Sequence, residues 1–592
     1  VALSVLGIQL SHFYASDTLL TFFIAASVLC SLRIVRRPTL ANSLALGLFV
    51  GLALSSKISA LPILFTALAG HALHLFVLPA LDEPGASEPG LETAAQSAEV
   101  LGDGGRPDDA DSSRRWWRAP TRGEVIHSTL LMAATLLTLV AVFVIAQPYV
   151  IVDFEAFRHD IVGQGEMVRG IADLPYTRQY ANTAPYLYFI TNLAVWGLGL
   201  PLGILALGGW ALSLARIPFR PRRTDLLLLS WVVPYFAITG SFHAKFLRYM
   251  LPILPFLCIF AALAAVYLVG RAGRRAWLVR AALGLVLVGT AFHALSFVNI
   301  YSAPHTAVAA SRWIYENVPK GSSISTEHWE EGMPVPIVVG NTSFSAGTQD
   351  YRMRTLNLYE PDNEAKVDHI VQVVSATDYI VLFSNRLYGT IPRLPDRYPV
   401  TSEYYHLLFS GQLGFRLEAF FTSYPNLLGL SLVDDTFADP GLPTPTGLGT
   451  FAPSPVSLNL GRPDESFTVY DHPKVMVLKK HEQMPPDELR QRLMSALRTG
   501  GPSPHARLML TPAEQAAMEV SGTFRSLFDR SDFANRFPVL VWVMAVELLG
   551  LAAIPIGYVM LPGLRDRGCL FGKTIGILLL AWLSWAPVSW GF

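Results

Sequence analysis

Ionisable residues interrupt or border long apolar stretches of this 592-residue chain, where a charge is costly unless it has a role. Asp17 precedes an apolar run in SHFYASDTLL, and Lys57 interrupts another in LALSSKISAL. Lys245 and Arg248 occur in FHAKFLRYMLPILP, where Tyr249 follows directly. A carboxylate can orient or deprotonate a hydroxyl group. Ammonium and guanidinium groups can bind a phosphate, so these residues are candidates for phosphate chemistry.

Each of these residues also has a structural interpretation. Asp17 could be the N-cap of the helix that follows it. Lys57 could extend its ammonium group to the membrane surface, and Lys245 and Arg248 could contact lipid headgroups. The three-residue spacing predicts that Lys245 and Arg248 share one side of a helix start. Two cations at the outer face of a membrane, where positive charge is otherwise scarce, favour an anionic ligand.

Polar residues close to Asp17 in the sequence, and others in the predicted loop at 150–185, extend the candidate site. His12 and Tyr14 lie close to Asp17 in the sequence. The segment 150–185 carries charges of both signs, which is typical either of an ordered lid over a polar cleft or of a salt-bridged surface loop. Its candidate cleft residues are Glu166, Arg169 and Arg178. Participation of a divalent metal is left open, with Asp17 as the one candidate ligand.

Long apolar helices must position these residues. The chain is 52% hydrophobic and 15% charged, whereas a soluble domain carries about 25% charged residues. A helix needs roughly 20 apolar residues to cross a bilayer. The predicted spans are 17–33, 39–56, 58–80, 125–147, 186–214, 225–242, 247–269, 277–299, 537–561 and 571–592.

Clusters of basic residues between the spans predict the orientation. The five clusters are Arg33, Arg36 and Arg37; Arg114, Arg115, Arg118 and Arg122; Arg216, Arg220, Arg222 and Arg223; Arg271, Arg274, Arg275 and Arg280; and Arg565, Arg567 and Lys573. Threading the spans alternately puts all five on one side, which is predicted to be cytoplasmic. Asp17, Lys57, Arg248 and the region 301–536 are then predicted to lie outside the cytoplasm.

The sequence predicts an α-helical polytopic membrane protein with an extracytoplasmic α/β domain. Residues 1–300 form the membrane domain, which is interrupted at 82–124 by a cytoplasmic linker predicted to be disordered because it is acidic and rich in small residues and proline. Residues 301–480 form the α/β domain, and 481–536 a linker with a helix near 512–528. Two further spans occupy residues 537–592.

Local patterns support an α/β fold for residues 301–480. HTAVAASRWIYENVP has helical spacing, whereas VPIVVG, DYIVLFS and KVMVLKK are typical of strands. Tyr404-Tyr405 and the stretch FTSYP either pack in the domain core or form a face whose rings stack on sugars.

Composition and motifs exclude several function classes. The net charge is zero, so no basic field favours nucleic acid as a partner. The three cysteines, Cys30, Cys258 and Cys569, lie in or beside apolar runs and do not indicate a disulfide framework or a zinc site. No P-loop or dinucleotide-binding motif is present.

Four stretches, in order, resemble bacterial glycosyltransferase family 39 of the GT-C superfamily. They are HFYASDTLLTFF, GLFVGLALSSKISAL, QGEMVRGIADLPYTRQY with WGLGLPLG, and FHAKFLRYMLPILP. WIYENVPKGSSISTEHWEEGMP and FTVYDHPKV resemble the outer region of the same subgroup, so the resemblance covers about residues 1–480. The superfamily includes protein O-mannosyltransferases and the aminoarabinose transferase of lipid A. The stretch from Phe537 onwards resembles the start of a YYY-type polytopic membrane domain.

The resemblance implies a GT-C-like fold and an inverting transfer of a sugar at the outer face of the plasma membrane. The donor would be a polyprenyl-phosphate sugar, and the acceptor a hydroxyl of a lipid, glycan or protein. The family's catalytic base is an acid in the first outer loop, which would precede Val1, so we expect this chain to be a fragment without it. The resemblance matches Asp17 to a later acidic position and Lys57 to a family lysine. It places Lys245, Arg248 and Tyr249 near the carrier phosphate.

A different class of function is also open. A non-catalytic polytopic protein, either a lipid-carrier transporter or a scaffold presenting residues 301–480, would share the composition. A transporter typically contains internal repeats, and the sequence shows none.

Overall fold

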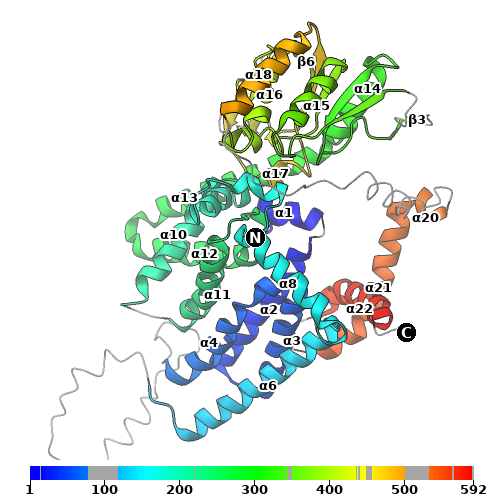
Figure 1. The fold of residues 1–592 in the computed structure, drawn as a ribbon. Coiled ribbons are helices and arrows are strands. Elements are labelled where there is room, and N and C mark those ends of the chain that lie inside the picture. The colour runs from blue at the N-terminus through cyan, green and yellow to red at the C-terminus, as the bar shows by residue number, and fades with distance from the viewer. Residues whose placement is uncertain are drawn as a thin grey trace, which may run out of the picture. The chain divides into compact units, whose positions relative to one another are not determined.

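A computed structural model describes most of the chain. It describes residues 1–13, 15–77, 118–219, 222–339, 342–344, 350–434, 437, 441–448, 456–499, 532–562, 564 and 566–589. The chain divides into two compact units, one with Val1–Leu139 and Gly163–Leu508, the other with Val140–Val162 and Met509–Phe592 (Figure 1). The helix predicted near 512–528 and most of the predicted linker 82–124 lie outside the described residues.

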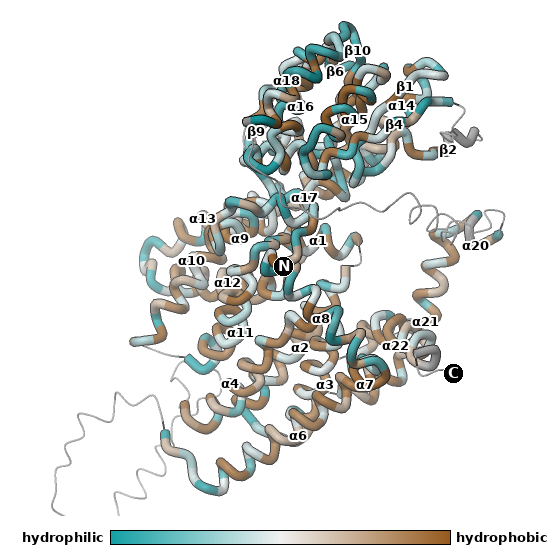
Figure 2. The backbone as a smooth tube through the Cα atoms, viewed as in Figure 1, coloured by the Kyte–Doolittle hydropathy of each residue, from teal (hydrophilic) through white to brown (hydrophobic). Residues whose placement is uncertain are grey.

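Apolar helices make up the membrane part of the first unit. They are α1 (Val5–His12), α2 (Ser16–Arg36), α3 (Leu40–Ser56), α4 (Ile63–Phe76), α6 (Arg122–Ala146), α9 (Leu187–Asn192), α10 (Leu200–Arg216), α11 (Arg223–Gly240), α12 (Leu254–Arg271) and α13 (Ala276–Val298). Within the described residues of both units, seven helices are long and apolar enough to cross a membrane. Figure 2 shows mostly hydrophobic residues along α6 and α21, in contrast to the polar surface of α18. The predicted polytopic helical fold is confirmed.

The single span predicted at 186–214 is wrong, because the chain breaks there. α9 continues into a π-helical turn at Leu193–Gly197, and α10 begins only at Leu200. Gly199 between them has φ +81°, and a Cβ at this position would lie 2.5 Å from Nδ1 of His293 on α13. Only glycine combines this backbone conformation with such close packing.

The ends of several helices meet where the basic clusters occur. Arg118 donates to the carbonyl oxygen of His74 (3.2 Å), and Nδ1 of the His74 ring contacts the carbonyl oxygen of Val35 (3.0 Å). Arg223 donates to the carbonyl oxygen of Val77 (2.6 Å). The end of α2, the end of α4 and the starts of α6 and α11 therefore lie together. This agrees with the threading for three of the five clusters, and the identity of that side as cytoplasmic stays a prediction.

Helix α6 begins with a capping box. The hydroxyl of Thr121 accepts from the backbone N–H of Glu124 (3.3 Å), and the Glu124 carboxylate accepts from the backbone N–H of Thr121 (2.8 Å). Arg118 also binds this carboxylate at 2.9 Å. Residues 118–124, predicted to belong to the disordered linker, are instead the ordered start of α6, because these bonds satisfy the free amides of its first turn.

We expect Thr121→Ala to lower the free energy of unfolding by about 1 kcal/mol, because it removes the cap. Thermal unfolding of the purified protein in detergent measures this as a lower Tm. Thr129→Ala is the matched control, since Thr129 is exposed on the same helix and bonds only to the carbonyl of its own turn, at Val125. Equal changes in both variants would rule out a specific contribution of the cap.

A five-stranded sheet in the order β4-β1-β5-β10-β6 forms the centre of the α/β domain. β1 (Ser323–Glu327), β4 (Arg352–Leu356) and β5 (Tyr379–Leu382) are parallel, and β10 (Val475–Lys480) runs antiparallel to β5 and β6 (Phe415–Phe421). Two smaller sheets pair β2 (Ile337–Val339) with β3 (Thr342–Phe344), and β7 (Asn426–Leu427) with β8 (Leu430–Val433) and β9 (Val456–Asn459).

Helices cover both faces of this sheet. α14 (Thr306–Asn317) shares one apolar cluster with Tyr379 and Val381 of β5. The alternate residues Ile380 and Leu382 belong to a second cluster, formed with α15 (Glu364–Ser375), α16 (Pro399–Phe409) and α18 (Pro486–Thr499). Because side chains alternate between the faces of a strand, this pattern defines three layers, helix–sheet–helix. The predicted α/β domain is present.

The predicted end of this domain needs correction. Residue 480 is not the end of its fold, because Leu489 and Leu493 of α18 are buried in the second cluster. Of the two interpretations of Tyr404 and Tyr405, core packing is confirmed, because both are completely buried on α16. VPIVVG does form a strand, β2, but that strand pairs with β3 rather than joining the large sheet.

The second unit contains α7 (Tyr149–Val152), α20 (Phe533–Arg536), α21 (Pro538–Met560) and α22 (Gly572–Ser589). α21 and α22 match the two predicted C-terminal spans. They approach closely through glycines: a Cβ at Gly576 would lie 2.4 Å from the carbonyl oxygen of Leu549. That they begin a second membrane domain stays a prediction.

Candidate functional site

Asp17 and Lys57 form an ion pair. Nζ of Lys57 lies 2.9 Å from Oδ1 of Asp17, whose side chain is 4% exposed, against 30% for Lys57. Asp17 is not the N-cap of α2, because that position is held by Ala15. It lies two residues further on, in the first turn, where the helix dipole favours a negative charge. Lys57 is the C-cap of α3, in an extended conformation, and its side chain reaches Asp17 in the first turn of α2.

The ring of Tyr249 joins this ion pair to Arg248. Both residues lie in the short 3₁₀ helix η5 (Leu247–Ile253), which precedes α12. Nζ of Lys57 is 4.7 Å from the centroid of the Tyr249 ring, and the guanidinium carbon of Arg248 is 5.8 Å from the same centroid. The hydroxyl of Tyr235 donates to the carbonyl oxygen of Tyr249 (2.8 Å) and holds it in place. We call Asp17, Lys57, Arg248 and Tyr249 the Asp17 cluster.

Arg248 is the exposed member of the Asp17 cluster. Its guanidinium group also stacks on Phe246 at 5.1 Å. In the described part of the chain, no carboxylate lies within ion-pair distance of it. A guanidinium group held by aromatic rings and without a carboxylate partner retains its fork of donors for an external anion.

Lys245 does not share a helix face with Arg248, so that prediction is wrong. α11 ends at Gly240, and Lys245 lies in irregular chain before η5, where helical spacing does not apply. It is 3% exposed, and its ammonium group donates to the carbonyl oxygen of His243 (3.2 Å). Burial lowers the pKa of Lys245 below its usual value.

The segment predicted as a loop at 150–185 is ordered. It contains α8 (Phe154–Arg169) and the 3₁₀ helix η3 (Pro175–Tyr180). The backbone N–H groups of His243 and Ala244 both donate to the carbonyl oxygen of Val168, at 2.8 and 3.2 Å. The rings of Tyr176 and Tyr180 contact Phe246, with centroids 6.2 and 5.2 Å apart. The end of α8 and η3 therefore pack on the chain that carries Lys245 and Arg248.

Glycine is required where this segment turns. Gly170 has φ +75°, and a Cβ there would lie 2.8 Å from the ring of His243. Burial, together with the charge of Lys245, lowers the pKa of His243, so its imidazole stays neutral over a wider pH range.

The other predicted cleft residues lie in different surroundings. Tyr14 is outside the described residues. His12 is exposed and stacks on Tyr301, with centroids 4.3 Å apart. Glu166 is half-buried on α8, and Arg169 is exposed with Nε donating to the carbonyl oxygen of Gly165 (2.9 Å).

Arg178 belongs to the junction with the α/β domain, not to the cleft as predicted. It is 3% exposed and binds both carboxylate oxygens of Asp173, at 3.0 and 2.9 Å. It also donates to the hydroxyl of Tyr398. Arg397 binds Asp173 as well. Burial alone would raise the pKa of Asp173, but the bonds from Arg178 and Arg397 outweigh it and hold this pKa below its ordinary value.

A second junction centres on α17 (Glu465–Thr468), which the sequence analysis missed as a site. The Asp464 carboxylate accepts from the hydroxyls of Tyr180 (3.2 Å) and Tyr188 (2.8 Å). Glu465 accepts from Gln179 at 2.7 Å. Burial raises the pKa of both Asp464 and Glu465. The sequence does contain a local sign of this site, because two adjacent acids occur in GRPDESFTV. Their hydrogen-bond partners, however, lie more than 270 residues earlier in the chain.

The Asp17 cluster does not fit a protein-held metal ion. It contains one carboxylate, and that carboxylate is paired with an ammonium group. Across the described residues, no three His, Cys, Asp or Glu side chains are grouped as metal ligands. We therefore derive no step that passes through a metal.

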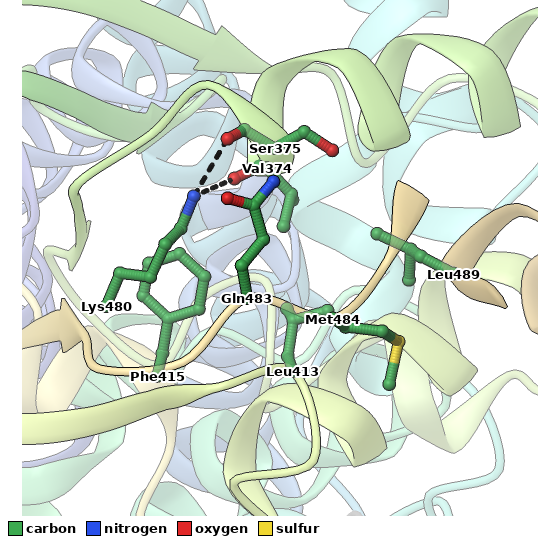
Figure 3. Close-up of a pocket in the computed structure, with 8 residues that line it drawn as sticks. All are labelled: Val374, Ser375, Leu413, Phe415, Lys480, Gln483, Met484 and Leu489. Carbon is green, nitrogen blue, oxygen red and sulfur yellow. Dashed lines mark hydrogen bonds between the residues drawn. The ribbon is translucent and has the colours of Figure 1, made fainter. Parts of the chain in front are cut away.

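A small depression in the α/β domain is not a site either. Figure 3 shows it between Phe415, Met484 and Leu489, with Lys480 at its edge. Its volume is about 10 Å³, roughly the space of one water. The ammonium group of Lys480 donates to the carbonyl oxygens of Val374 and Ser375, both at 2.9 Å, and so caps the end of α15.

Comparison with known proteins gives two findings. Residues 121–352 match the model of the Alg9-like mannosyltransferase family, and this range contains Arg248 but not Asp17 or Lys57. Among solved structures, the archaeal oligosaccharyltransferase AglB from Archaeoglobus fulgidus, in complex with an inhibitory peptide and a dolichol-phosphate, is similar at 11% identity and a TM-score of 0.29. That similarity covers 69% of this chain and 56% of that one. No curated protein matches the sequence.

The structure and the family match together support a coarse classification. The fold is that of a polytopic, helical membrane protein, and residues 121–352 are similar to a family of membrane mannosyltransferases.

Proposed function

We propose that the chain is the family 39-like part of an inverting glycosyltransferase at the outer face of the plasma membrane. It moves a sugar from a polyprenyl-phosphate donor to a hydroxyl of a lipid, glycan or protein. The observation that carries the proposal is the Asp17 cluster, in which Lys57 and the exposed Arg248 flank the ring of Tyr249. This cluster lies at the end of the helix bundle that is remote from the basic clusters of α2, α6 and α11.

The two cations have distinct tasks in this proposal. Arg248 binds the donor phosphate with two parallel N–H donors, and Lys57 adds a point charge. Asp17 positions Lys57, because it accepts one of the three ammonium protons and leaves others for a ligand. Lys245 stabilises its own loop through its bond to His243 and does not touch the phosphate.

The reaction follows from these tasks. The acceptor oxygen attacks the anomeric carbon from the face opposite the phosphate, and the bond from that carbon to the phosphate oxygen breaks. The electron pair leaves with the phosphate, whose growing charge Lys57 and Arg248 stabilise. The acceptor proton passes to a carboxylate. Because Asp17 is engaged with Lys57, we assign this proton to a second acid outside the Asp17 cluster.

Arg248→Ala is expected to weaken polyprenyl-phosphate binding about ten- to a hundredfold. Losing a hydrogen bond to a charged group costs roughly 1.5–3 kcal/mol, which corresponds to that factor. Arg248→Lys should recover only part of the affinity, because the fork of donors is lost. Binding of a short-chain polyprenyl phosphate to the full chain in detergent, at fixed salt, measures both.

Arg271→Ala is the matched control, because this exposed arginine ends α12 at the opposite end from Arg248. It should leave the affinity unchanged. Unchanged affinity in Arg248→Ala would refute the phosphate site. Binding without any sugar transfer would favour the non-catalytic alternative, a lipid-carrier protein.

A further inference from the structure

A cavity of about 230 Å³ opens beside the loop that leads to Asp17. Its walls come from the end of α1, the chain after α13 and the chain after α17, so it lies where the membrane helices meet the α/β domain. On the same measure as the 10 Å³ depression beside Lys480, one water needs roughly 10–15 Å³, so this cavity is many times larger. The cavity can therefore hold a small organic group.

Aromatic rings provide the apolar part of the lining. Phe13 is 43% exposed and Tyr470 is 56% exposed, and their rings meet edge to face with centroids 6.1 Å apart. His12 and Tyr301 stack on each other in the same wall. Exposed rings that gather around a cavity indicate a contact surface for a ligand with an apolar face.

Polar groups with unused capacity line the same cavity. Asp471 accepts from the hydroxyl of Tyr301 and from Nε2 of Gln9, which leaves further lone pairs on its oxygens. Within the described residues, neither ring nitrogen of His12 makes a hydrogen bond. His305 is already engaged, since Nδ1 accepts from the backbone N–H of Ala307 (3.2 Å) and Nε2 contacts the carbonyl oxygen of Tyr470 (3.3 Å).

We propose that this cavity is a subsite for a neutral sugar ring. A pyranose has a face of C–H groups, which packs on aromatic rings, and an edge of hydroxyls, which donate to a carboxylate and exchange bonds with an imidazole. Phe13 and Tyr470 supply the first kind of contact, and Asp471 and His12 the second. The sequence stretch FTSYP contributes Ser423 to the same wall.

Other ligand classes fit the lining less well. Among the described residues, no lysine or arginine lines the cavity, and the carboxylate of Asp471 disfavours a phosphate. The same carboxylate disfavours a hydrocarbon chain. A divalent cation would prefer several oxygen ligands, and Asp471 is the one acid among the lining residues that the structure describes.

The position of the cavity suits a substrate of the proposed reaction. His12 is five residues from Asp17, so their Cα atoms are at most about 18 Å apart. The cavity and the Asp17 cluster therefore lie in the same region, at the junction between the end of α1 and the start of α2. The identification of this sugar as a substrate rests on the proposed function, whereas the binding of a sugar ring does not. The ring could belong to the donor or to a glycan acceptor.

Direct binding of free glycosides tests the subsite. We expect methyl α-mannopyranoside or methyl β-glucopyranoside to bind the full chain in nanodiscs, as detected by saturation-transfer NMR. Tyr470→Ala and His12→Ala should each weaken this binding roughly three- to tenfold, the size of one lost ring contact. Tyr470→Phe should bind normally, because it keeps the ring. Both residues are exposed, so the fold should tolerate these changes.

Trp277→Ala is the matched control, an exposed ring (66%) at the opposite end of α13 from the cavity. A polyprenyl-phosphate mannose then distinguishes the source of the ring. If Tyr470→Ala weakens its binding but not that of bare polyprenyl phosphate, the subsite holds the donor sugar. If it weakens only the free glycosides, the subsite holds the acceptor glycan.

Two outcomes would overturn the subsite and leave the proposed function standing. One is a failure of both glycosides to bind a chain that still binds polyprenyl phosphate. The other is glycoside binding that Tyr470→Ala and His12→Ala leave unchanged. Glycoside binding without any polyprenyl-phosphate binding would instead refute the proposed function and keep the sugar subsite.

Discussion

Replacing Lys57 with methionine should reduce the rate of sugar transfer about 10²- to 10³-fold. This is the typical cost of removing one donor that stabilises charge developing in a transition state. Methionine keeps the length and flexibility of the side chain but cannot meet the charge of the departing phosphate. Single-turnover transfer from a labelled polyprenyl-phosphate sugar, by the full protein in proteoliposomes, measures the effect.

The coupling of Lys57 to Asp17 gives this prediction a second readout. Asp17→Asn should slow transfer less than Lys57→Met does, because the ammonium group stays but is held less firmly. If Asp17 acts only through Lys57, the double variant should be no slower than Lys57→Met alone. Additive losses would mean that Asp17 touches the substrate itself.

Lys320 offers a matched control within the chain. It also pairs with an aspartate, Asp350, at 3.0 Å, but it is 81% exposed in the α/β domain. Lys320→Met should leave the rate of transfer unchanged. A similar loss in both variants would indicate a general effect of charge and would remove Lys57 from the site.

The membrane spans could be predicted from sequence because the bilayer fixes their length. The span predicted at 277–299 is α13 at Ala276–Val298, and that at 537–561 is α21 at Pro538–Met560. The break in the span predicted at 186–214 could not be predicted in this way. It depends on the ring of His293, which packs on Gly199 from a helix more than 70 residues away.

The candidate site could be predicted in part. Counting spans placed Asp17, Lys57 and Arg248 at one end of the bundle. The ion pair of Asp17 with Lys57 and the contacts of Lys57 and Arg248 with the Tyr249 ring agree with this. The ion pair between Asp17 and Lys57 joins residues 40 positions apart, and no local pattern indicates it. The inference for Lys245 failed because a three-residue spacing implies a shared face only inside a helix.

Long-range packing explains the remaining errors. Arg178 looked like a cleft residue because its charge stood in a mixed loop, but its partner Tyr398 is 220 residues away. The α/β domain was predicted to end at residue 480, before α18, because that helix is polar on one side. The burial of Leu489 and Leu493 shows that α18 packs in the core of the domain. Such contacts depend on tertiary structure, which single-sequence patterns do not contain.

Buried carboxyl groups in the α/β domain predict a marked dependence of its stability on pH. Glu327 ends β1 and accepts from the hydroxyl of Tyr405, and its Oε2 has no partner within the described residues. Glu330 accepts from Ser384 and lies 3.8 Å from Arg386. Burial raises the pKa of both glutamates to about 8, although these bonds and the charge of Arg386 oppose it.

The direction of the effect follows from these pKa values. Both lie above the ordinary value of 4.5, so between pH 4.5 and 8 the folded domain keeps protons that the unfolded chain releases. The stability present below pH 4.5 is therefore lost as the pH rises towards 8. Each group therefore lowers the free energy of unfolding as the pH rises through this window.

We expect the full protein in detergent to unfold at a lower temperature at pH 8 than at pH 5, followed by tryptophan fluorescence. Glu327→Gln keeps the shape of the side chain and its bond to Tyr405, and it should remove about half of the pH dependence. Glu418→Gln is the control, because Glu418 lies on β6 with its side chain 36% exposed, and it should leave the dependence intact. A stability that rises between pH 5 and pH 8, or an unchanged slope in Glu327→Gln, would mean that these glutamates are ionised in the folded domain.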